Sequence, residues 1–432
     1  MHWLSQRDCL ANDKLWKIYW WGGHRDESLI RSLTTRQKLI NISKICETAS
    51  VTPGLGFLEG NKQYPRKWLG NYKELSVEFL TRYGSTNLAR LSAVPSHVAR
   101  RGVREVFEGN RLLIRRGIPT GGQITVRHET KPFCFRHSII GFRLNGFEPW
   151  QEKTLTAIYW SSLARYFFFL TAGSWGMWHD ELLTEAAGEM PICFPKETKL
   201  RDRIVRIVED LQKLDLQPDG LELGGVEAQK RLPKLEHQLN EAIFDLYELN
   251  TAERDLVTEM CSVGLDLLYR NQKSDALQIV SRPNSNIGVL EDVKDTKNEL
   301  AAYLRTFLEA WNNELEPDSE LAWHVVSPSS RAPLLMVRFT TKYKKDVLAK
   351  SEEGDAEQWH NILERLGKDS RVRAHSSRIF IDTFFRYVSD HEILFIKRNE
   401  KRFWTHTAAR EDAESALANL MNLEDVAQRE KQ

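Results

Sequence analysis

The stretch FEGNRLLIRRG, residues 107–117, decides how the first part of this chain folds. Leu112, Leu113 and Ile114 form a short apolar run between arginines. Such a run, bounded by charged residues, is typical of a strand that is buried in a sheet. We therefore expect residues 111–116 to form a buried strand with basic flanks.

The sequence on both sides of this strand has the features of a mixed α/β region that reaches to about residue 200. Residues 154–170 are apolar at helical spacing and predict a largely buried helix that ends at 171–173. Aromatic residues are frequent, and turn-forming pairs separate short segments at Pro53-Gly54, Gly121-Gly122 and Asn145-Gly146.

Residues 201–275 change to a helical pattern, interrupted by a polar stretch at 217–225 that we expect to be a loop. Asn250 and Glu253 fit a capping box at the start of a helix that should run to about Tyr269. An apolar stripe at spacings of three and four, more often a core or helix-pair seam than a partner site, comprises Leu232, Leu235, Leu239, Ile243 and Leu246.

The last part of the chain predicts a small α+β domain after a linker rich in Ser, Asn and Pro at 281–286. Helices are expected at 300–311 and about 408–423, with a tight hairpin turn at Ser389-Asp390. Strands are expected at 321–326, 334–339, 379–388 and 393–397. The fold class is therefore predicted to be α+β, with domains at 1–200 and 295–432 and a helical connector at 201–275.

Bulk composition describes a globular protein of more than one domain. Hydrophobic residues make up 41% and charged residues 28% of the 432 residues, which excludes global disorder. No apolar run approaches the length of a membrane span, and the first residues lack a signal-peptide core, so we expect a cytoplasmic location. The cysteines form no CxxC pair and are expected to be reduced thiols: Cys9, Cys46, Cys134, Cys193 and Cys261.

Positive charge is concentrated in the first part of the chain. Residues 1–200 hold 28 Lys and Arg against 18 Asp and Glu, a net charge of +10. The remaining residues hold 33 and 42, a net charge of −9. Such a division is expected when one part faces a polyanion, although solvated charge can also segregate by chance.

The basic residues are densest at 101–143. This stretch contains nine basic and only three acidic residues, and Phe107, Phe133 and Phe135 lie among them. Arginine suits nucleic-acid recognition because its planar fork binds both guanine edges and phosphates. A charged sheet face is the alternative explanation. The nine residues are Arg101, Arg104, Arg111, Arg115, Arg116, Arg127, Lys131, Arg136 and Arg143.

Catalytic motifs are not found in the sequence. A methyltransferase that uses S-adenosylmethionine needs a glycine-rich turn and an Asn/Asp-Pro-Pro-aromatic tetrapeptide, and Pro-Pro never occurs here. Pro317-Asp318 begins a magnesium-nuclease pattern that lacks a convincing partner. The histidines do not have metal-ligand spacing. We therefore expect a protein that binds and does not catalyse.

The first two hundred residues resemble the TaqI-like C-terminal specificity domain of N-6 adenine DNA methyltransferases. Residues 239–253 are similar to the helix pair that commonly follows this domain. Asn110 stands where the family usually has proline, and Trp160 where it has asparagine. The resemblance is carried by ordered motifs at 15–18, 21–26, 54–57, 107–117, 155–169, 171–176 and 190–192.

The methylase half of the fused enzymes has no counterpart in this sequence, so the resemblance implies a separate specificity chain. It also implies a basic cleft that reads base edges of double-stranded DNA, mainly in the major groove. The expected partner is a separately encoded N-6 adenine methyltransferase of a restriction-modification or phage-defence system. S-adenosylmethionine would bind only to that partner, and no cofactor or metal is expected on this chain.

We expect DNA contacts from basic residues of the region and from the turn at 174–176, although part of the strand and of the turn could be structural. A scaffold subunit that has this fold but does not read DNA stays open as the alternative. The residues expected at the DNA are Arg101, Arg104, Arg111, Arg115, Arg116, Arg127, Lys131, Arg136, Ser174 and Trp175.

Overall fold

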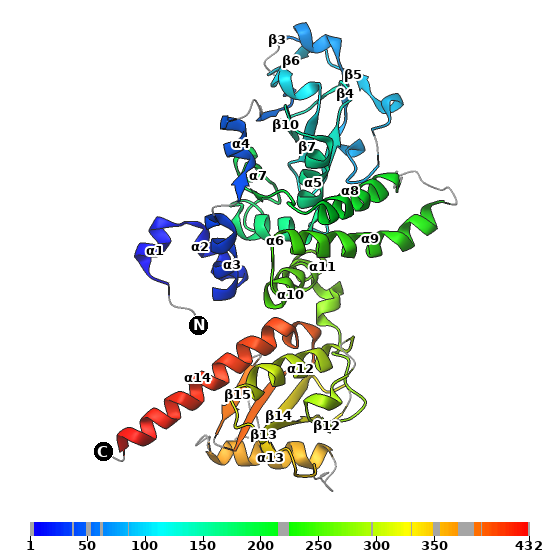
Figure 1. The fold of residues 1–432 in the computed structure, drawn as a ribbon. Helices are drawn as coiled ribbons and strands as arrows, with labels where there is room; N and C mark the ends of the chain where they lie inside the picture. Colours follow the sequence, from blue (N-terminus) through cyan, green and yellow to red (C-terminus); the bar gives the residue numbers. More distant parts are fainter. Residues whose placement is uncertain are drawn as a thin grey trace. The chain divides into compact units, whose positions relative to one another are not determined.

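The computed structural model divides into two compact units, Met1–Tyr269 and Arg270–Gln432, which we call unit 1 and unit 2 and describe separately (Figure 1). The described residues form many helices and several small, mostly antiparallel sheets, which confirms the predicted α+β class. No helix among the described residues is long and apolar enough to cross a membrane. The structure describes residues 4–36, 39–48, 53–60, 64–84, 86–214, 224–294, 297–329, 331–348, 355–369, 384–389 and 391–430.

Unit 1 is built around a four-stranded antiparallel sheet that contains the predicted strand. The central pair aligns Leu113 with Gly141. A side chain at Gly141 would collide with Val106, so glycine lets the segment that contains Val106 approach the sheet. In sheet order the strands are β2 (Pro53–Leu55), β10 (Ile139–Arg143), β7 (Arg111–Arg115) and β8 (Val126–Glu129).

Both faces of this sheet are covered, which explains the uninterrupted apolar run in β7. Leu112 and Ile114 point into the large cluster formed with the helices α5 (Pro149–Trp160) and α6 (Ser162–Thr171). Leu113 points the other way, into a second cluster rich in phenylalanine. The expected buried strand at 111–116 is therefore confirmed, with β7 ending at Arg115.

The helix expected at 154–170 is two helices, α5 and α6, because the chain turns at Ser161. Ser161 has an extended backbone, and its side-chain oxygen accepts a hydrogen bond from the Ala164 amide at 3.3 Å. A serine in this conformation caps a new helix and ends the previous one. The apolar pattern continues through the break because both helices are buried in the same core.

A small lobe covers the phenylalanine-rich face of the sheet. Its core comprises Phe57, Phe107, Phe133 and Phe135. Short strands and 3₁₀ turns surround this core: β3 (Tyr64–Pro65), η1 (Lys67–Asn71), β4 (Lys73–Leu75), β5 (Ser92–Ala93), β6 (His97–Val98), η4 (Arg104–Phe107) and β9 (Cys134–Phe135).

The helices that follow residue 197 pack into unit 1, so the segment expected as a connector belongs to the same compact unit as the sheet. The apolar stripe lies in that core, with Leu235, Leu239 and Ile243 buried. Most of the expected loop at 217–225 lies outside the described residues. The helices are α8 (Thr198–Lys213), α9 (Gly224–Leu246), α10 (Thr251–Glu259) and α11 (Leu265–Arg270).

The predicted capping box begins α10 as expected. The Asn250 side chain accepts a hydrogen bond from the Glu253 amide at 3.0 Å, and the Glu253 carboxylate accepts one from the Asn250 amide at 2.9 Å. After Glu259 one π-helical turn, Met260–Gly264, leads into α11, so the helix to about Tyr269 is interrupted in its middle.

Three helices form the N-terminal part of unit 1, and a buried lysine fastens the second of them to α6. Lys17 is 6% exposed, and its Nζ donates a hydrogen bond to the Ala172 carbonyl at the end of α6. The same Nζ lies 5.4 Å from the centre of the Phe169 ring. The helices are α1 (Gln6–Ala11), α2 (Lys14–Trp21) and α3 (His24–Thr35).

Lys17 should make the stability of unit 1 depend on pH. Burial lowers its pKa to about 7, and the charge of Asp180 opposes this shift only in part. Between about pH 7 and the ordinary lysine pKa the unfolded chain holds a proton that the folded chain has lost, so stability rises with pH there. We expect Lys17→Met to remove a slope of up to about 1.4 kcal/mol per pH unit, as measured by urea unfolding from pH 6 to 10. If the free energy of unfolding changed with pH equally in the variant and the unmodified chain, Lys17 would not be the source of the pH dependence.

Unit 2 contains a five-stranded antiparallel sheet between helices. Helices α12 (Glu299–Asn312) and α14 (His406–Glu430) cover one face, and α13 (Asp355–Asp369) packs on the other (Figure 1). Residues 379–383 and 390 of the expected hairpin lie outside the described residues. The strand order is β12 (Ile287–Gly288), β13 (Ser319–Val326), β14 (Leu334–Tyr343), β16 (Glu392–Arg398) and β15 (Phe384–Val388).

Candidate nucleic-acid interface

Six basic side chains of unit 1 lie on adjoining backbone segments, and we call them the basic ridge: Arg66, Arg100, Arg101, Arg116, Arg136 and His137. At one end of the ridge, β3 pairs with β6, so that Pro65 faces His97. Arg101 Nε donates to the Pro65 carbonyl at 2.9 Å, and an Arg66 guanidinium nitrogen donates to the Val94 carbonyl at 2.9 Å. Backbone carbonyls therefore orient these two arginines without neutralising them.

The segment Phe57-Leu58 joins the two ends of the ridge. Leu58 pairs with Arg100 in an antiparallel bridge, and Phe57 pairs with Arg136 in a parallel one. The His137 amide donates to the Phe57 carbonyl at 2.8 Å. Residues that are far apart in sequence are thereby brought to one surface by two short backbone pairings.

His137 lies in a positive electrostatic environment, because three arginines of the ridge act on it. Partial burial lowers its pKa, and the charges of Arg116, Arg100 and Arg136 lower it further. Its Nδ1 atom is buried and has no hydrogen-bond partner among the described residues. A site with several cations favours an anionic ligand.

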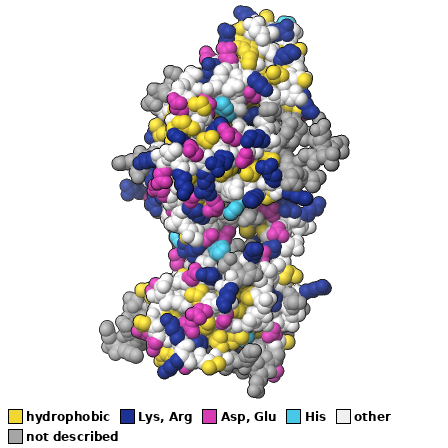
Figure 2. All heavy atoms as spheres, turned by 45° about the vertical axis from the view of Figure 1, so that its right-hand side comes forward, with side chains coloured by type: hydrophobic (Ala, Val, Ile, Leu, Met, Phe, Trp, Pro, Cys, Tyr) yellow, Lys and Arg dark blue, Asp and Glu magenta, His cyan; other side chains and the backbone are white. Residues whose placement is uncertain are grey.

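Some arginines of the ridge are already paired with carboxylates. Arg136 bonds Glu74 at 2.6 Å and also Glu59, while Arg116 bonds Glu181 at 2.8 Å. Within the described part of the chain, Arg66, Arg100 and Arg101 have no ion pair. These three therefore carry most of the uncompensated charge. The uppermost part of Figure 2, where Figure 1 labels β3 and β6, shows Lys and Arg side chains among hydrophobic ones, with some Asp and Glu side chains beside them.

The structure brings three of the expected DNA-contacting residues into this ridge, Arg101, Arg116 and Arg136. Arg115 is half-buried at the end of β7, next to Arg116. Arg104 is exposed, and its guanidinium lies 5.8 Å from the centre of the Trp68 ring. Lys131 donates through Nζ to the Thr86 carbonyl at 3.2 Å.

Two of the expected contact residues, Arg111 and Arg127, are buried and are corrected to structural roles. Arg111 is fully buried and donates to the carbonyls of Gly109 and Lys131. Arg127 is 2% exposed and donates to both oxygens of Thr81 and to the Thr86 hydroxyl. A guanidinium in such surroundings satisfies loop carbonyls and cannot reach a phosphate.

The turn at 174–176 also differs from the expectation. Trp175 is fully buried, and its ring packs edge-to-face against that of Phe169. Its Nε1 donates a hydrogen bond to the Tyr269 hydroxyl at 2.6 Å. The half-buried Ser174 contributes its carbonyl to hydrogen bonds within the turn. Trp178, three residues after Trp175, is 83% exposed.

Arg66, Arg100 and Trp178 are not among the residues predicted from the sequence. Arg100 precedes the basic window by one residue, and Arg66 lies in a region of ordinary charge density. A search for basic residues next to Gly, Pro and aromatic residues in 60–100 would have found Arg66. No local pattern distinguishes the buried Trp175 from the exposed Trp178.

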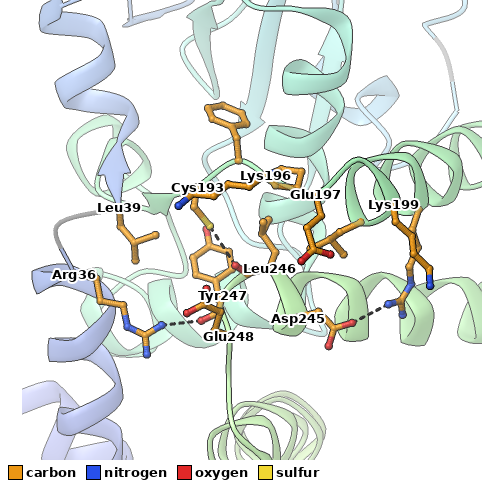
Figure 3. Close-up of a pocket in the computed structure, with 14 residues that line it drawn as sticks. Arg36, Leu39, Cys193, Lys196, Glu197, Lys199, Asp245, Leu246, Tyr247 and Glu248 are labelled. Atoms are coloured by element: carbon orange, nitrogen blue, oxygen red, sulfur yellow. Dashed lines mark hydrogen bonds and ion pairs between the residues drawn. The ribbon is translucent and has the colours of Figure 1, made fainter.

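A separate groove of about 510 Å³ lies between the ends of α3 and α9 and the start of α8 (Figure 3). Arg36 donates to the Tyr247 carbonyl at 2.8 Å, and Arg203 pairs with Asp245 at 2.8 Å. Burial raises the pKa of the Cys193 thiol to about 12, so this sulfur is a poor nucleophile at neutral pH. The described residues contain no cluster of His, Cys, Asp and Glu that could hold a metal ion.

No family model matches the chain, and no curated protein matches it. A chain from a structural study of complex assembly and conformational transition of the type I restriction-modification system is similar at 10% identity, with a TM-score of 0.26. The match covers 52% of this chain, which spans about half the length of that structure.

Proposed function

We propose that this chain is a DNA-binding specificity subunit, which directs a separately encoded N-6 adenine methyltransferase to its target in a restriction-modification or phage-defence system. It would bind DNA without catalysing a reaction itself. The observation that carries the proposal is the basic ridge, in which Arg66, Arg100 and Arg101 keep uncompensated charge among the described residues.

The ridge suits a phosphate backbone for physical reasons. Phosphate contacts release condensed counterions, so a row of arginines gives strong and salt-dependent binding. The carbonyls of Pro65 and Val94 hold Arg101 and Arg66 in fixed positions, which lowers the entropy lost on binding. Base discrimination would come from additional side chains near the ridge, as phosphate contacts alone carry no sequence information.

The triple variant Arg66→Ala, Arg100→Ala, Arg101→Ala tests the ridge. We expect its affinity for duplex DNA near 0.1 M salt to fall by roughly tenfold to a hundredfold. The slope of log affinity against log salt should flatten by about 2 to 3, since each lost phosphate contact removes about 0.9. Fluorescence anisotropy across a salt series, with a random-sequence duplex and with an enriched motif, measures both quantities.

A charge-matched control replaces Arg305, Lys344 and Lys345 of unit 2 by alanine. It changes the net charge equally, and we expect its salt slope to match that of the unmodified chain. Equal losses in the two triple variants would show that total charge, and no particular surface, determines binding. Salt-insensitive or absent DNA binding by the unmodified chain, alone and with the methyltransferase, would contradict the proposal itself.

A scaffold subunit that does not read DNA is the second candidate, because helices α1 and α2 expose large apolar side chains. Leu10, Trp16 and Trp20 are 80%, 65% and 73% exposed, and the two tryptophans lie one helical turn apart. Exposed tryptophan is typical of protein interfaces. Trp16→Ala with Trp20→Ala should weaken methyltransferase binding in this case, while DNA affinity would be unchanged.

A further inference from the structure

The turn between α6 and Glu181, which forms a β-bridge, holds Trp175 in the core and exposes Trp178 to solvent. The Ser174 carbonyl accepts hydrogen bonds from the amides of Met177 at 3.2 Å and Trp178 at 3.1 Å. Gly176 has a φ of +73°, and its amide donates to the Asp180 carboxylate at 3.1 Å. These bonds fix the turn so that Trp175 is buried and Trp178 is 83% exposed.

Backbone pairing places this turn beside the basic ridge. Gly117 forms an antiparallel bridge with Glu181, the Ile118 amide donates to the Asp180 carbonyl at 2.7 Å, and the Leu182 amide donates to the Arg116 carbonyl at 2.8 Å. The Arg116 guanidinium, which belongs to the ridge, bonds the Glu181 carboxylate at 2.8 Å. Trp178 is therefore attached to the ridge through a short and hydrogen-bonded connection.

The charges near Trp178 are compatible with a nucleic-acid ligand. Of the two carboxylates that follow it, Glu181 is neutralised by Arg116, while Asp180 accepts a hydrogen bond from the Gly176 amide and keeps its charge on the side of the turn. The neighbouring ring of His179 meets the Trp178 ring edge-on at 5.9 Å. An exposed indole on a turn that is hydrogen-bonded to an arginine-bearing segment is an arrangement in which a nucleobase can stack while phosphates of the same strand bind the arginines.

We propose that Trp178 is a stacking platform for an unpaired or flipped nucleobase of the DNA strand whose phosphates contact the basic ridge. The inference rests on the proposed DNA-binding function and specifies its ligand. A base inside a duplex already stacks on its neighbours, so the platform favours a base that has left the helix. The chain would then stabilise an opened site in the DNA.

The test compares Trp178→Ala, Trp178→Phe and the control Trp16→Ala, which removes another exposed tryptophan. The probes are a fully paired duplex and the same duplex with one unpaired 2-aminopurine. We expect Trp178→Ala to weaken binding of the second probe by about fivefold to a hundredfold, within the range of one base stack, and to leave the first almost unchanged. Trp178→Phe should retain most of the affinity, and only an aromatic residue should quench the 2-aminopurine fluorescence.

The outcomes separate this inference from the proposed function. Salt-dependent binding of both probes, with no effect of Trp178→Ala on affinity or quenching, would overturn the stacking role and leave the DNA-binding function standing. Equal losses on the paired and unpaired probes would also overturn it, since stacking of an extruded base would not be involved. No binding of either probe by the unmodified chain would remove the proposed function and the inference with it. Because Trp178 is exposed, its replacement should not disturb the core, and thermal unfolding should confirm that the variants are folded.

Discussion

Replacing Asp412 by alanine should lower the free energy of unfolding of unit 2 by about 3–5 kcal/mol, because it leaves the buried ammonium of Lys397 without its counterion. Lys397 of β16 is 3% exposed, and Asp412 of α14 is 6% exposed. The two side chains form a buried ion pair. The Tyr303 hydroxyl of α12 donates to the same carboxylate at 2.6 Å.

Aromatic rings enclose the ammonium of Lys397 and exclude the water that could otherwise replace its counterion. The Lys397 Nζ lies 5.0 Å from the centre of the Tyr303 ring and 5.2 Å from that of Trp404, and it donates to the Phe403 carbonyl at 3.1 Å. Burial lowers the pKa of Lys397, while the charge of Asp412 opposes the shift. Without Asp412 the remaining partners cannot replace a full negative charge.

Hydrogen exchange measured by mass spectrometry can follow this effect in unit 2 alone, through peptides from 319–343 and 392–398. The exposed pair Arg305–Glu309 is the control, and Glu309→Ala should cost less than about 1 kcal/mol. The double variant Lys397→Met, Asp412→Leu should recover part of the loss, because an apolar pair needs no counterion but leaves the buried Tyr303 hydroxyl without its acceptor. A loss of less than 1 kcal/mol for Asp412→Ala would show that the pair is open to water.

The elements that the sequence predicted correctly are those whose pattern depends on local chemistry. The aliphatic residues of 112–114 require burial whatever surrounds them, and Asn250 with Glu253 forms a capping box from residues three apart. The break at Ser161 was missed because both helices around it are buried, so the apolar pattern continues across the turn. A serine within an apolar run can also lie on the surface of a continuous helix, so Ser161 alone did not predict the break.

The candidate site was predicted in part, because composition locates basic residues without showing which of them reach solvent. Arg101, Arg116 and Arg136 lie on the ridge, but Arg111 and Arg127 are buried by carbonyls from other segments of the chain. The ridge itself depends on the pairing of Phe57-Leu58 with residues about 40 and 80 positions away. Such pairings join distant segments, so no local sequence pattern predicts them.

Arg111 gives the second large effect, since its removal should destabilise unit 1 without changing the basic ridge. We expect Arg111→Ala to lower the free energy of unfolding by about 3 kcal/mol, because the carbonyls of Gly109 and Lys131 lose their donor. The guanidinium also lies 4.7 Å from the centre of the Phe133 ring, so alanine leaves a gap in the core of the small lobe. Arg104→Ala, at an exposed position, should change stability by less than about 0.5 kcal/mol.

Arg111→Met separates the structural role from a DNA-contacting one. Methionine keeps an unbranched chain over Phe133 but carries neither charge nor donors, so its stability should lie between those of the alanine variant and the unmodified chain. At a temperature where all variants are folded, Arg111→Met should bind duplex DNA within about twofold of the unmodified chain, with the same salt slope. A folded Arg111→Met protein whose slope flattens by about 0.9 would mean that Arg111 leaves the core to contact a phosphate. The burial of Arg111 makes the first result the expected one, because leaving the core would strand the two carbonyls that it now satisfies.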